Sequence, residues 1–334
     1  MVRCSVSLGL WLDRPAEEVL ETAEVADVCG YPELWVGEMA TYDAFALATA
    51  VGARTRHIDL TVGPLPVTVR DPMMIAMGTA SVAGLTGRRC GVALGTSSPA
   101  VVERWHGRSR ARPARALRES AIAVGQLLAG ERGEIDGEVV RTSGYRLRLP
   151  PPRGPVTVAA FGPAAVRVAA AHADRMVANL VSVDELAGLG RSLKEAQRDE
   201  QRTATRLAVW VPTAVDPAPE AVEQIRRAAV AYLAAPGYGE MFEEAGFGDL
   251  VAQARGGARP GELLASVPDE LVETVGALGD VDEVMRRLEA YVAAGADEVV
   301  IVPSATDADP AGAGTLRALA DRLHVRSGPA AAPA

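Results

Sequence analysis

The stretch GLTGRRCGVALGTSSPAVVERWHG, from Gly84 to Gly107, decides the fold of this chain. Within it, an apolar run from Cys90 to Leu94 opens into the small and hydroxyl-bearing residues of Gly95–Pro99. This order is typical of a buried parallel strand that leads into a loop facing a ligand. Because the loop has no bulky side chain to keep a flat molecule away, the stretch predicts an α/β fold with a binding site at this strand end.

Units of helix, glycine and strand recur along the chain and predict a closed barrel. A strand at 6–10 precedes a helix that begins at Pro15 and ends at Gly30, and a strand at 33–36 follows. A helix from 281 to 292, Gly295 and a strand at 298–302 repeat this order near the other end. Further strands are expected near 58–65, 90–95, 155–160, 175–180 and 206–212. Eight such units without a break in composition favour a single (β/α)8 TIM barrel over residues 1–326, rather than an open sheet.

Two segments interrupt the repeat, one after strand 4 and one after strand 7. Turn signals at Asp136-Gly137 and Ser143-Gly144 predict a hairpin within 131–154. Residues 215–279 are rich in proline, glycine and acidic residues. We expect them to form an insertion or lid on the face where barrel active sites lie. The tail at 327–334 is expected to be disordered.

The bulk composition is that of a globular protein with an acidic balance. The 334 residues are 49% hydrophobic and 23% charged, and they carry a net charge of -9. This charge argues against nucleic-acid and anionic-membrane partners. The arginines within 104–118 are the one local exception, and we expect them to form a solvated face.

The N-terminus lacks the features of a signal peptide, and no apolar run reaches the roughly 20 residues that span a bilayer. The isolated cysteines Cys4, Cys29 and Cys90 fit a reducing cytoplasm and no metal site.

The residues expected at the ends of the strands disfavour hydrolysis. None of the four histidines lies at such an end, and the sequence places neither a Ser-His-Asp set nor a metal cluster there. The strand ends instead carry small residues, peptide groups, the carboxylate of Glu38, the hydroxyls of Thr96 and Ser97, and the amide of Asn179. Such a set suits a flat, hydrogen-bonding heterocyclic cofactor that supplies its own chemistry.

Three features at these strand ends have two interpretations each. Glu38 is an exposed loop carboxylate in the first interpretation. In the second it is functional, as a hydrogen-bond partner of a cofactor ring or as a proton donor. Trp11 either packs at the barrel mouth or forms a wall of the substrate pocket. The turn Phe161-Gly162-Pro163-Ala164 is either a plain strand-to-helix turn or an anion site. In the second case Gly162 allows close approach, and the helix that begins at Pro163 directs free N–H groups to a phosphate.

Six motifs stand in a fixed order over about residues 3–325. They are ELWVGEM at 33–39, a third strand whose prolines and glycine predict a bulge before Arg70-Asp71-Pro72, LTGRRCGVALGTSSP at 85–99, Trp-His-Gly at 105–107, VAAFGPAAVRVAA at 158–170 and GADEVVIVP at 295–303. Together they resemble the luciferase-like monooxygenase superfamily, and within it the branch that uses the deazaflavin coenzyme F420.

The resemblance implies a cofactor that lies across the carboxyl-terminal mouth of a (β/α)8 barrel. A strained bulge in the third strand, often with a cis non-proline peptide, would support the cofactor ring at Val62-Gly63. The resemblance matches Glu38 to the ring, Thr96 and Ser97 to the loop after strand 4, and Gly162, Pro163 and Ala164 to the phosphate site. Phe161 and Asn179, at their own strand ends, complete the expected cofactor contacts.

Two departures from the family bear on the reaction. Sugar-phosphate dehydrogenases of this branch carry a histidine where this chain has Met39, and a glutamate where it has Ser98. The acid-base pair of that activity is therefore missing, and sugar-phosphate oxidation is not expected. Trp11, Met39, Tyr42 and Phe45 instead predict a more apolar site.

The resemblance and the departures predict an F420-dependent oxidoreductase. It would transfer a hydride between reduced F420 and an electron-poor C=C or C=N bond of a small, largely apolar substrate, with protonation by Glu38, Asp43 or water. The alternatives are an FMN-dependent luciferase-like monooxygenase and a catalytically silent flavin-binding relative. Barrels of this type commonly pair through their second and third helices, so a homodimer is expected.

Overall fold

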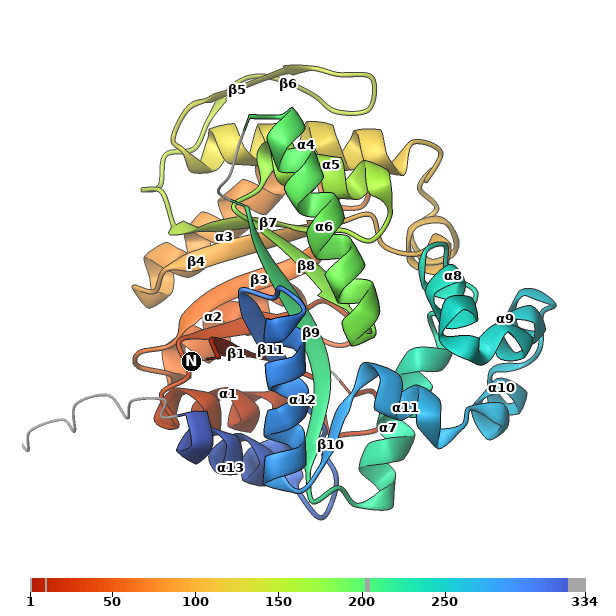
Figure 1. Cartoon of the computed structure of the whole chain (residues 1–334). Coiled ribbons are helices and arrows are strands. Elements are labelled where there is room, and N and C mark those ends of the chain that lie inside the picture. The colour runs from red at the N-terminus through yellow and green to blue at the C-terminus, as the bar shows by residue number, and fades with distance from the viewer. Residues whose placement is uncertain (1, 10, 202–204, 324–334) are drawn as a thin grey trace, which may run out of the picture. The chain divides into compact units, whose positions relative to one another are not determined.

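The computed structural model describes residues 2–9, 11–201 and 205–323, and its strand order is that of a closed (β/α)8 barrel (Figure 1). The parallel strands of the barrel are β1 (Cys4–Ser7), β2 (Glu33–Val36), β3 (Asp59–Pro66), β4 (Cys90–Gly95), β7 (Arg153–Ala159), β8 (Arg175–Asn179), β9 (Arg206–Val215) and β11 (Glu298–Pro303). The predicted TIM-barrel fold is confirmed. The first strand ends before the expected 6–10 does. Leu10 lies outside the described residues, as does the tail at 327–334.

The helices between the strands follow from local capping and turn residues. They are α1 (Glu18–Val28), α2 (Ala44–Arg54), α3 (Pro72–Thr86), α4 (Pro113–Leu128), α5 (Pro163–His172), α6 (Val183–Asp199), α12 (Val281–Ala293) and α13 (Ala313–Leu323). Helix α3 illustrates the rule, because Asp71 accepts a hydrogen bond from the Met74 N–H at its start, and Gly87 ends it at a φ of 69°. Over the described ranges, every helix is too short or too polar to cross a membrane.

The chain divides into two compact units. Unit 1 holds the described parts of Met1–Tyr31, Ala178–Gly190 and Ala208–Ala334, and unit 2 holds Pro32–Val177 and the described part of Arg191–Leu207. In unit 1, β11 pairs with both β1 and β9 in parallel register. In unit 2, β2, β3, β4 and β7 pair in that order, and the register shifts between Val62 and Leu65 of β3. The predicted bulge in the third strand is therefore present.

A buried ion pair lies inside unit 2. Arg175, fully buried, donates to both carboxylate oxygens of Glu33, with Nη1–Oε2 at 3.0 Å and Nη2–Oε1 at 2.6 Å. Thr61 and Thr157 accept further hydrogen bonds from the same guanidinium, which also stacks 4.1 Å from the ring centroid of Trp35. A buried bidentate pair is stable only with such complete partnering, because each charge has lost its hydration.

A hairpin lies between β4 and β7, within the stretch whose turn signals predict one. Its antiparallel strands are β5 (Arg132–Asp136) and β6 (Arg141–Arg146), and it lies beside α4 (Figure 1). The buried Glu119 carboxylate of α4 accepts the N–H groups of Glu138, Val139 and Val140 at 3.1, 2.9 and 2.8 Å. Burial raises the pKa of Glu119, but these three hydrogen bonds outweigh it and bring the pKa below its ordinary value.

A helical insertion follows β9 in unit 1. It comprises α7 (Pro219–Val230), α8 (Tyr238–Phe242), η2 (Glu243–Phe247), α9 (Gly248–Arg255), α10 (Pro260–Ser266) and α11 (Asp269–Val275). The short strand β10 (Ala277–Gly279) then pairs with β9, with Ala277 opposite Thr213. The insertion thus returns to the edge of the strand from which it departs.

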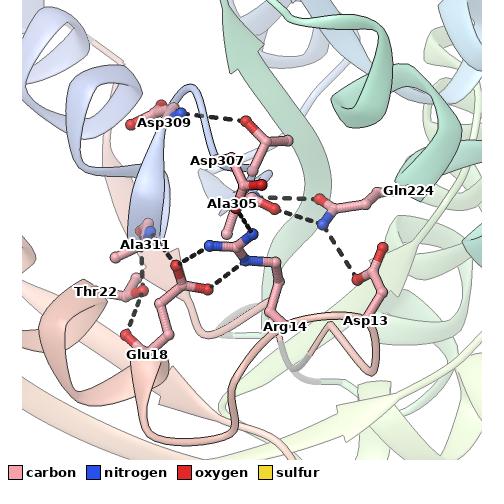
Figure 2. A network of polar contacts seen from close by, with 10 residues as sticks. Asp13, Arg14, Glu18, Thr22, Gln224, Ala305, Asp307, Asp309 and Ala311 are labelled. Carbon is pink, nitrogen blue, oxygen red and sulfur yellow. Dashed lines mark hydrogen bonds and ion pairs between the residues drawn. The ribbon is translucent and has the colours of Figure 1, made fainter.

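Helix α7 is fastened to two barrel loops of unit 1. The Gln224 amide accepts the Ala305 N–H at 3.1 Å and donates to the Ala305 carbonyl and to Asp13 (Figure 2). Arg14, next to Asp13, donates to Glu18 and Asp307 in the same network. Arg227, one turn along α7, donates to Asp13 Oδ2 at 2.7 Å. The base of the insertion is therefore held by the Asp13 side chain and the Ala305 backbone, which come from opposite ends of the sequence.

Candidate active site

A bridging arginine organises the exits of β2 and β3 in unit 2. Arg70 Nε donates to Glu38 Oε2 at 2.9 Å, and Arg70 Nη2 donates to both Glu38 and Asp43. The two carboxylates that the sequence predicts to be catalytic are thus brought together by one guanidinium. Glu38 is only 21% exposed at its side chain, so it is neither a freely solvated loop carboxylate nor an unpaired one.

Asp43 has a structural role in addition to its ion pair. Its Oδ1 accepts the N–H groups of Phe45 and Ala46, both at 3.0 Å, and so caps the start of α2. Burial raises the pKa of Asp43, but the hydrogen bonds from Arg70 and from these backbone groups lower it below the ordinary value. Asp43 is therefore ionised near neutral pH, which favours a positioning role over proton donation.

Apolar side chains border this polar bridge. The Arg70 guanidinium lies 5.3 Å from the ring centroid of Phe45. Met39 and Tyr42, on the loop after β2, are 46% and 42% exposed. An exposed thioether and an exposed phenol ring beside a charged bridge provide a surface on which an apolar molecule can rest.

The bulge of β3 brings backbone close to the exit of β4. Gly63 has a φ of 120°, and a Cβ there would lie 2.3 Å from the Ala93 carbonyl oxygen, so only glycine fits. The cis peptide expected at Val62-Gly63 is instead found at Gly63-Pro64. That part of the expectation is wrong, because the tertiary amide of proline adopts the cis form far more readily than a secondary amide does. Beyond the bulge, the buried hydroxyl of Thr68 has no hydrogen-bond partner among the described residues.

The loops after β4 and β7 lie next to each other. Leu94 is opposite Val158 in the parallel register, so Thr96 and Ser97 leave the sheet beside Ala160 and Phe161. Thr96 is half-buried, and Ser97 is exposed with a φ of 54°. Arg110, from the segment after η1 (Ala100–Trp105), reaches back to both: its Nε donates to the Ser97 carbonyl at 3.0 Å and its Nη2 to Thr96 Oγ1 at 3.3 Å.

The start of α5 has the geometry of an anion site. Gly162 is its N-cap and no side chain caps the helix, while Pro163 occupies the first turn. Gly162, Pro163 and Ala164 are exposed, and a Cβ at Gly162 would meet nothing within 4 Å. Uncapped N–H groups at the positive end of a helix dipole attract anions. Together with the unpartnered Thr68 hydroxyl, they fit a cofactor that carries both a hydrogen-bonding ring and a phosphate.

Two predicted site residues belong to unit 1 and have partners there. The Trp11 indole N–H donates to the Pro303 carbonyl at 2.9 Å, which is the packing role that the sequence left open. The Asn179 amide hydrogen-bonds to Tyr232 and Tyr238 of the insertion, whose rings lie 4.7 Å apart. Burial raises the pKa of both tyrosines, so their hydroxyls stay protonated.

The sequence alone does not identify the arginines of this site. Arg70 is visible only as part of a motif, and Arg110 only as one member of a run of arginines. Their partners lie 27 to 32 and 13 to 14 residues away, and no helical or strand period links such positions. The described residues hold no group of three or more His, Cys, Asp or Glu side chains that could bind a metal.

Comparison with known proteins provides an independent test of the family. A sequence model of the luciferase-like monooxygenase family matches residues 5–298. A Mycobacterium tuberculosis protein named as a coenzyme F420-dependent oxidoreductase is 24% identical, and the match covers 92% of this chain and 96% of that protein. The predicted resemblance, including its F420 branch, is thereby confirmed.

Solved structures share the fold across nearly the whole chain. The F420-dependent tetrahydromethanopterin reductase of Methanopyrus kandleri superimposes with a TM-score of 0.82 at 19% identity, over 96% of this chain and 99% of that one. An FMN-bound Baeyer-Villiger monooxygenase component from Pseudomonas putida gives 0.68 at 16% identity, over 96% and 97%. The match over residues 5–298 and the barrel fold together establish that this chain belongs to the luciferase-like monooxygenase family of oxidoreductases.

Proposed function

We propose that this protein is an F420-dependent oxidoreductase that acts on a small, largely apolar substrate with an electron-poor C=C or C=N bond. When bound, reduced F420 supplies a hydride from carbon 5 of its deazaflavin ring. The names of its relatives, an F420-dependent oxidoreductase among them, support this cofactor. The protein's own contribution is to bind, orient and shield the reacting groups.

The observation that carries the proposal is the pairing of two adjacent strand exits in unit 2. The exit of β7 leads into the uncapped start of α5, which suits a phosphate, while the neighbouring β4 exit has only small and hydroxyl side chains. We infer that Phe161–Ala164 bind the phosphate and that Thr96, Ser97 and the backbone at Val62-Gly63 border the ring. Asn179 and Trp11 belong to unit 1 and stay predictions from the sequence.

The β2 exit supports an apolar substrate and a single proton source. Arg70 holds Glu38 in one orientation, so that a bound substrate would meet a fixed carboxyl group. Because Arg70 pairs with both carboxylates, we propose a water that Glu38 orients as the proton donor, with Asp43 as a positioning residue. Met39 and Tyr42 supply the apolar surface.

A cofactor titration of the purified protein tests the proposal. Fluorescence titration with F420 and, separately, with FMN should show tighter binding of F420. The protein loaded with reduced F420 (F420H2) should then reduce an activated alkene such as 2-cyclohexenone, and the rise in absorbance of the oxidised F420 that forms measures the turnover. Preferential tight binding of FMN would refute the proposal. A protein that binds F420 but reduces neither activated alkenes nor imines would instead be a silent cofactor-binding relative.

FMN-dependent oxygenation is the second candidate, and one specific observation favours it. A structure with FMN bound shares this fold at a TM-score of 0.68, and FMN ends in a phosphate that the start of α5 would suit equally well. Formation of an oxygenated product from an added substrate, in the presence of FMN, NADH and a flavin reductase and absent when this protein is left out, separates this candidate from the first.

We also propose that the protein is a homodimer and that it is located in the cytoplasm. On α3 of unit 2, Met74, Met77 and Leu85 are 50%, 49% and 75% exposed and lie along one side of the helix. We propose that this stripe and the neighbouring α2 form the dimer interface. Analytical ultracentrifugation should give a dimer for the wild type and a monomer for Met77→Glu. The free cysteines Cys4, Cys29 and Cys90 support a reducing location.

A further inference from the structure

Among the arginines within 104–118, Arg110 has an unusual set of partners. Its two hydrogen bonds go to neutral acceptors, the Ser97 carbonyl and the Thr96 hydroxyl. A guanidinium has five N–H donors, so these two contacts leave donors available. The described residues offer Arg110 no carboxylate within ion-pair distance, and its charge is therefore not neutralised by the protein.

Its neighbours in the sequence are different. Arg112 and Arg115 both form ion pairs with the single carboxylate of Glu138, Arg115 at 2.7 Å. These two arginines hold the hairpin against the start of α4, and their charge is partly satisfied. The run of arginines thus separates into a structural pair and one residue that is fixed at a strand exit without a counter-ion.

Arg110 is held at the strand exit that neighbours the proposed phosphate site. Thr96 and Ser97 leave β4 beside the exit of β7, and a Cβ at Gly95 would lie 3.7 Å from that of Ala159. The chain then passes through Ala160 and Phe161 to Gly162 at the start of α5. The Arg110 guanidinium is therefore held at the strand next to the one that leads into α5, whose first N–H groups suit a phosphate. An anionic chain that leaves this phosphate toward β4 would meet Arg110.

We propose that Arg110 binds the anionic tail that F420 carries beyond its phosphate, an inference that rests on the proposed function. F420 continues from its phosphate through a lactate into γ-linked glutamates, each of which carries a carboxylate, whereas FMN ends at the phosphate. An arginine fork matches a carboxylate in charge and geometry. Arg110 is thus a specificity-determining residue that favours F420 over FMN without touching the ring.

Fluorescence titrations of wild type, Arg110→Ala and Arg112→Ala with four ligands test the inference. The ligands are the ribityl deazaflavin FO, which lacks phosphate and tail, F420 without glutamates, F420 with glutamates, and FMN. Arg110→Ala should raise the Kd for glutamate-bearing F420 about tenfold, the size expected for a half-exposed charged contact. It should leave the Kd for FO and for FMN unchanged, and it should weaken glutamate-free F420 less, because that tail ends in the single carboxylate of the lactate. The wild-type Kd for glutamate-bearing F420 should also rise more steeply with NaCl than that of Arg110→Ala.

The matched control and the ligand series separate the possible failures. Arg112→Ala removes an arginine from the same run, and it should change none of the four Kd values. Equal weakening of glutamate-free F420 and FMN in Arg110→Ala would overturn the inference, since Arg110 would then contact the phosphate. An unchanged Kd for every ligand would also overturn it. If the wild type binds FMN but neither FO nor F420, the proposed function itself fails.

Discussion

At the scale of single residues, the site depends on side chains that serve two roles at once. Arg70 neutralises two carboxylates and covers an aromatic ring, and Asp43 both accepts from Arg70 and caps α2. A substitution at such a residue changes the fold and the site together. Variants must therefore be chosen in pairs that separate the two effects.

Asp43 allows such a pair. Asp43→Asn keeps an oxygen that can cap α2 but loses the charge opposite Arg70, while Asp43→Ala loses both. We expect Asp43→Ala to lower the free energy of unfolding by about 1 kcal/mol more than Asp43→Asn, the usual contribution of an N-cap. The Asn variant itself should cost less than about 1 kcal/mol, because Asp43 is half exposed. Urea denaturation followed by circular dichroism measures both, and equal losses would contradict the N-cap role.

At the scale of elements, the start of α5 is the feature that the function uses most directly. Gly162 stands in open space with a φ of -79°, a conformation open to any residue. Side chains can therefore be added there without disturbing the helix, which makes the position a probe of what α5 binds.

Gly162→Asp and Gly162→Asn form a matched test of the phosphate assignment. Both side chains can cap the helix, but only Asp places a negative charge where the phosphate would lie. We expect Gly162→Asp to weaken F420 binding about tenfold or more relative to Gly162→Asn, with thermal stability kept in both. Fluorescence titration and thermal denaturation are the measurements. Equal affinities for the two variants would remove the phosphate from this site.

The hairpin after α4 depends on the Glu119 carboxylate in the same local way. Glu119→Gln replaces an acceptor of three N–H groups by an amide, and we expect a loss of about 1–3 kcal/mol. The measurement is amide hydrogen exchange at Glu138, Val139 and Val140. Glu134→Gln, an exposed acidic residue on the same hairpin, is the control and should have a smaller effect on these amides.

The same carboxylate gives the hairpin a defined pH dependence. Because the folded-state pKa of Glu119 is lowered, its stabilisation is complete above the unfolded value near ~4.3 and is lost as the pH falls through the folded value. Protection of the three amides should therefore fall in wild type below about pH 4 and change little in Glu119→Gln. Equal acid sensitivity of the two proteins would contradict this role.

At the scale of the whole molecule, short-range patterns predict the barrel well and the long-range polar contacts poorly. Glycines after helices, as at Gly30 and Gly295, and apolar strands mark the repeat because both signals are local. The loop at Thr96-Ser97 and the turn at Gly162 are equally local. The Glu33–Arg175 pair joins residues 142 positions apart, and although Glu33 opens the ELWVGEM motif, nothing in the sequence links it to Arg175. Such pairs become visible only when the strands are in register.

The Glu33–Arg175 pair leads to a prediction about the stability of unit 2 as a whole. Arg175→Met leaves the Glu33 charge buried without its partner, and we expect a loss of about 3–5 kcal/mol in the free energy of unfolding. Adding Glu33→Gln should recover part of this loss, because no buried charge then remains. Arg112→Met, which removes a half-exposed ion pair, should cost less than about 1 kcal/mol. Guanidinium denaturation measures all three, and a double variant less stable than Arg175→Met would contradict the explanation.

Gln224 and Arg227 attach α7 to the barrel loops of unit 1, whereas later helices of the same insertion lack these contacts. Both residues lie on the first helix of the insertion, and the loops they bind come from β1 and β11 of the same unit. Helices α9 and α10, farther along the insertion, carry none of these contacts, whereas Tyr238 joins α8 to Asn179 of β8. Helices α9 and α10 can be substituted, or exchanged for those of a relative, while α7 keeps its hydrogen bonds to the barrel loops. Within unit 1, α9 and α10 are therefore the part of the insertion that can be exchanged while α7 keeps its contacts with the loops after β1 and β11.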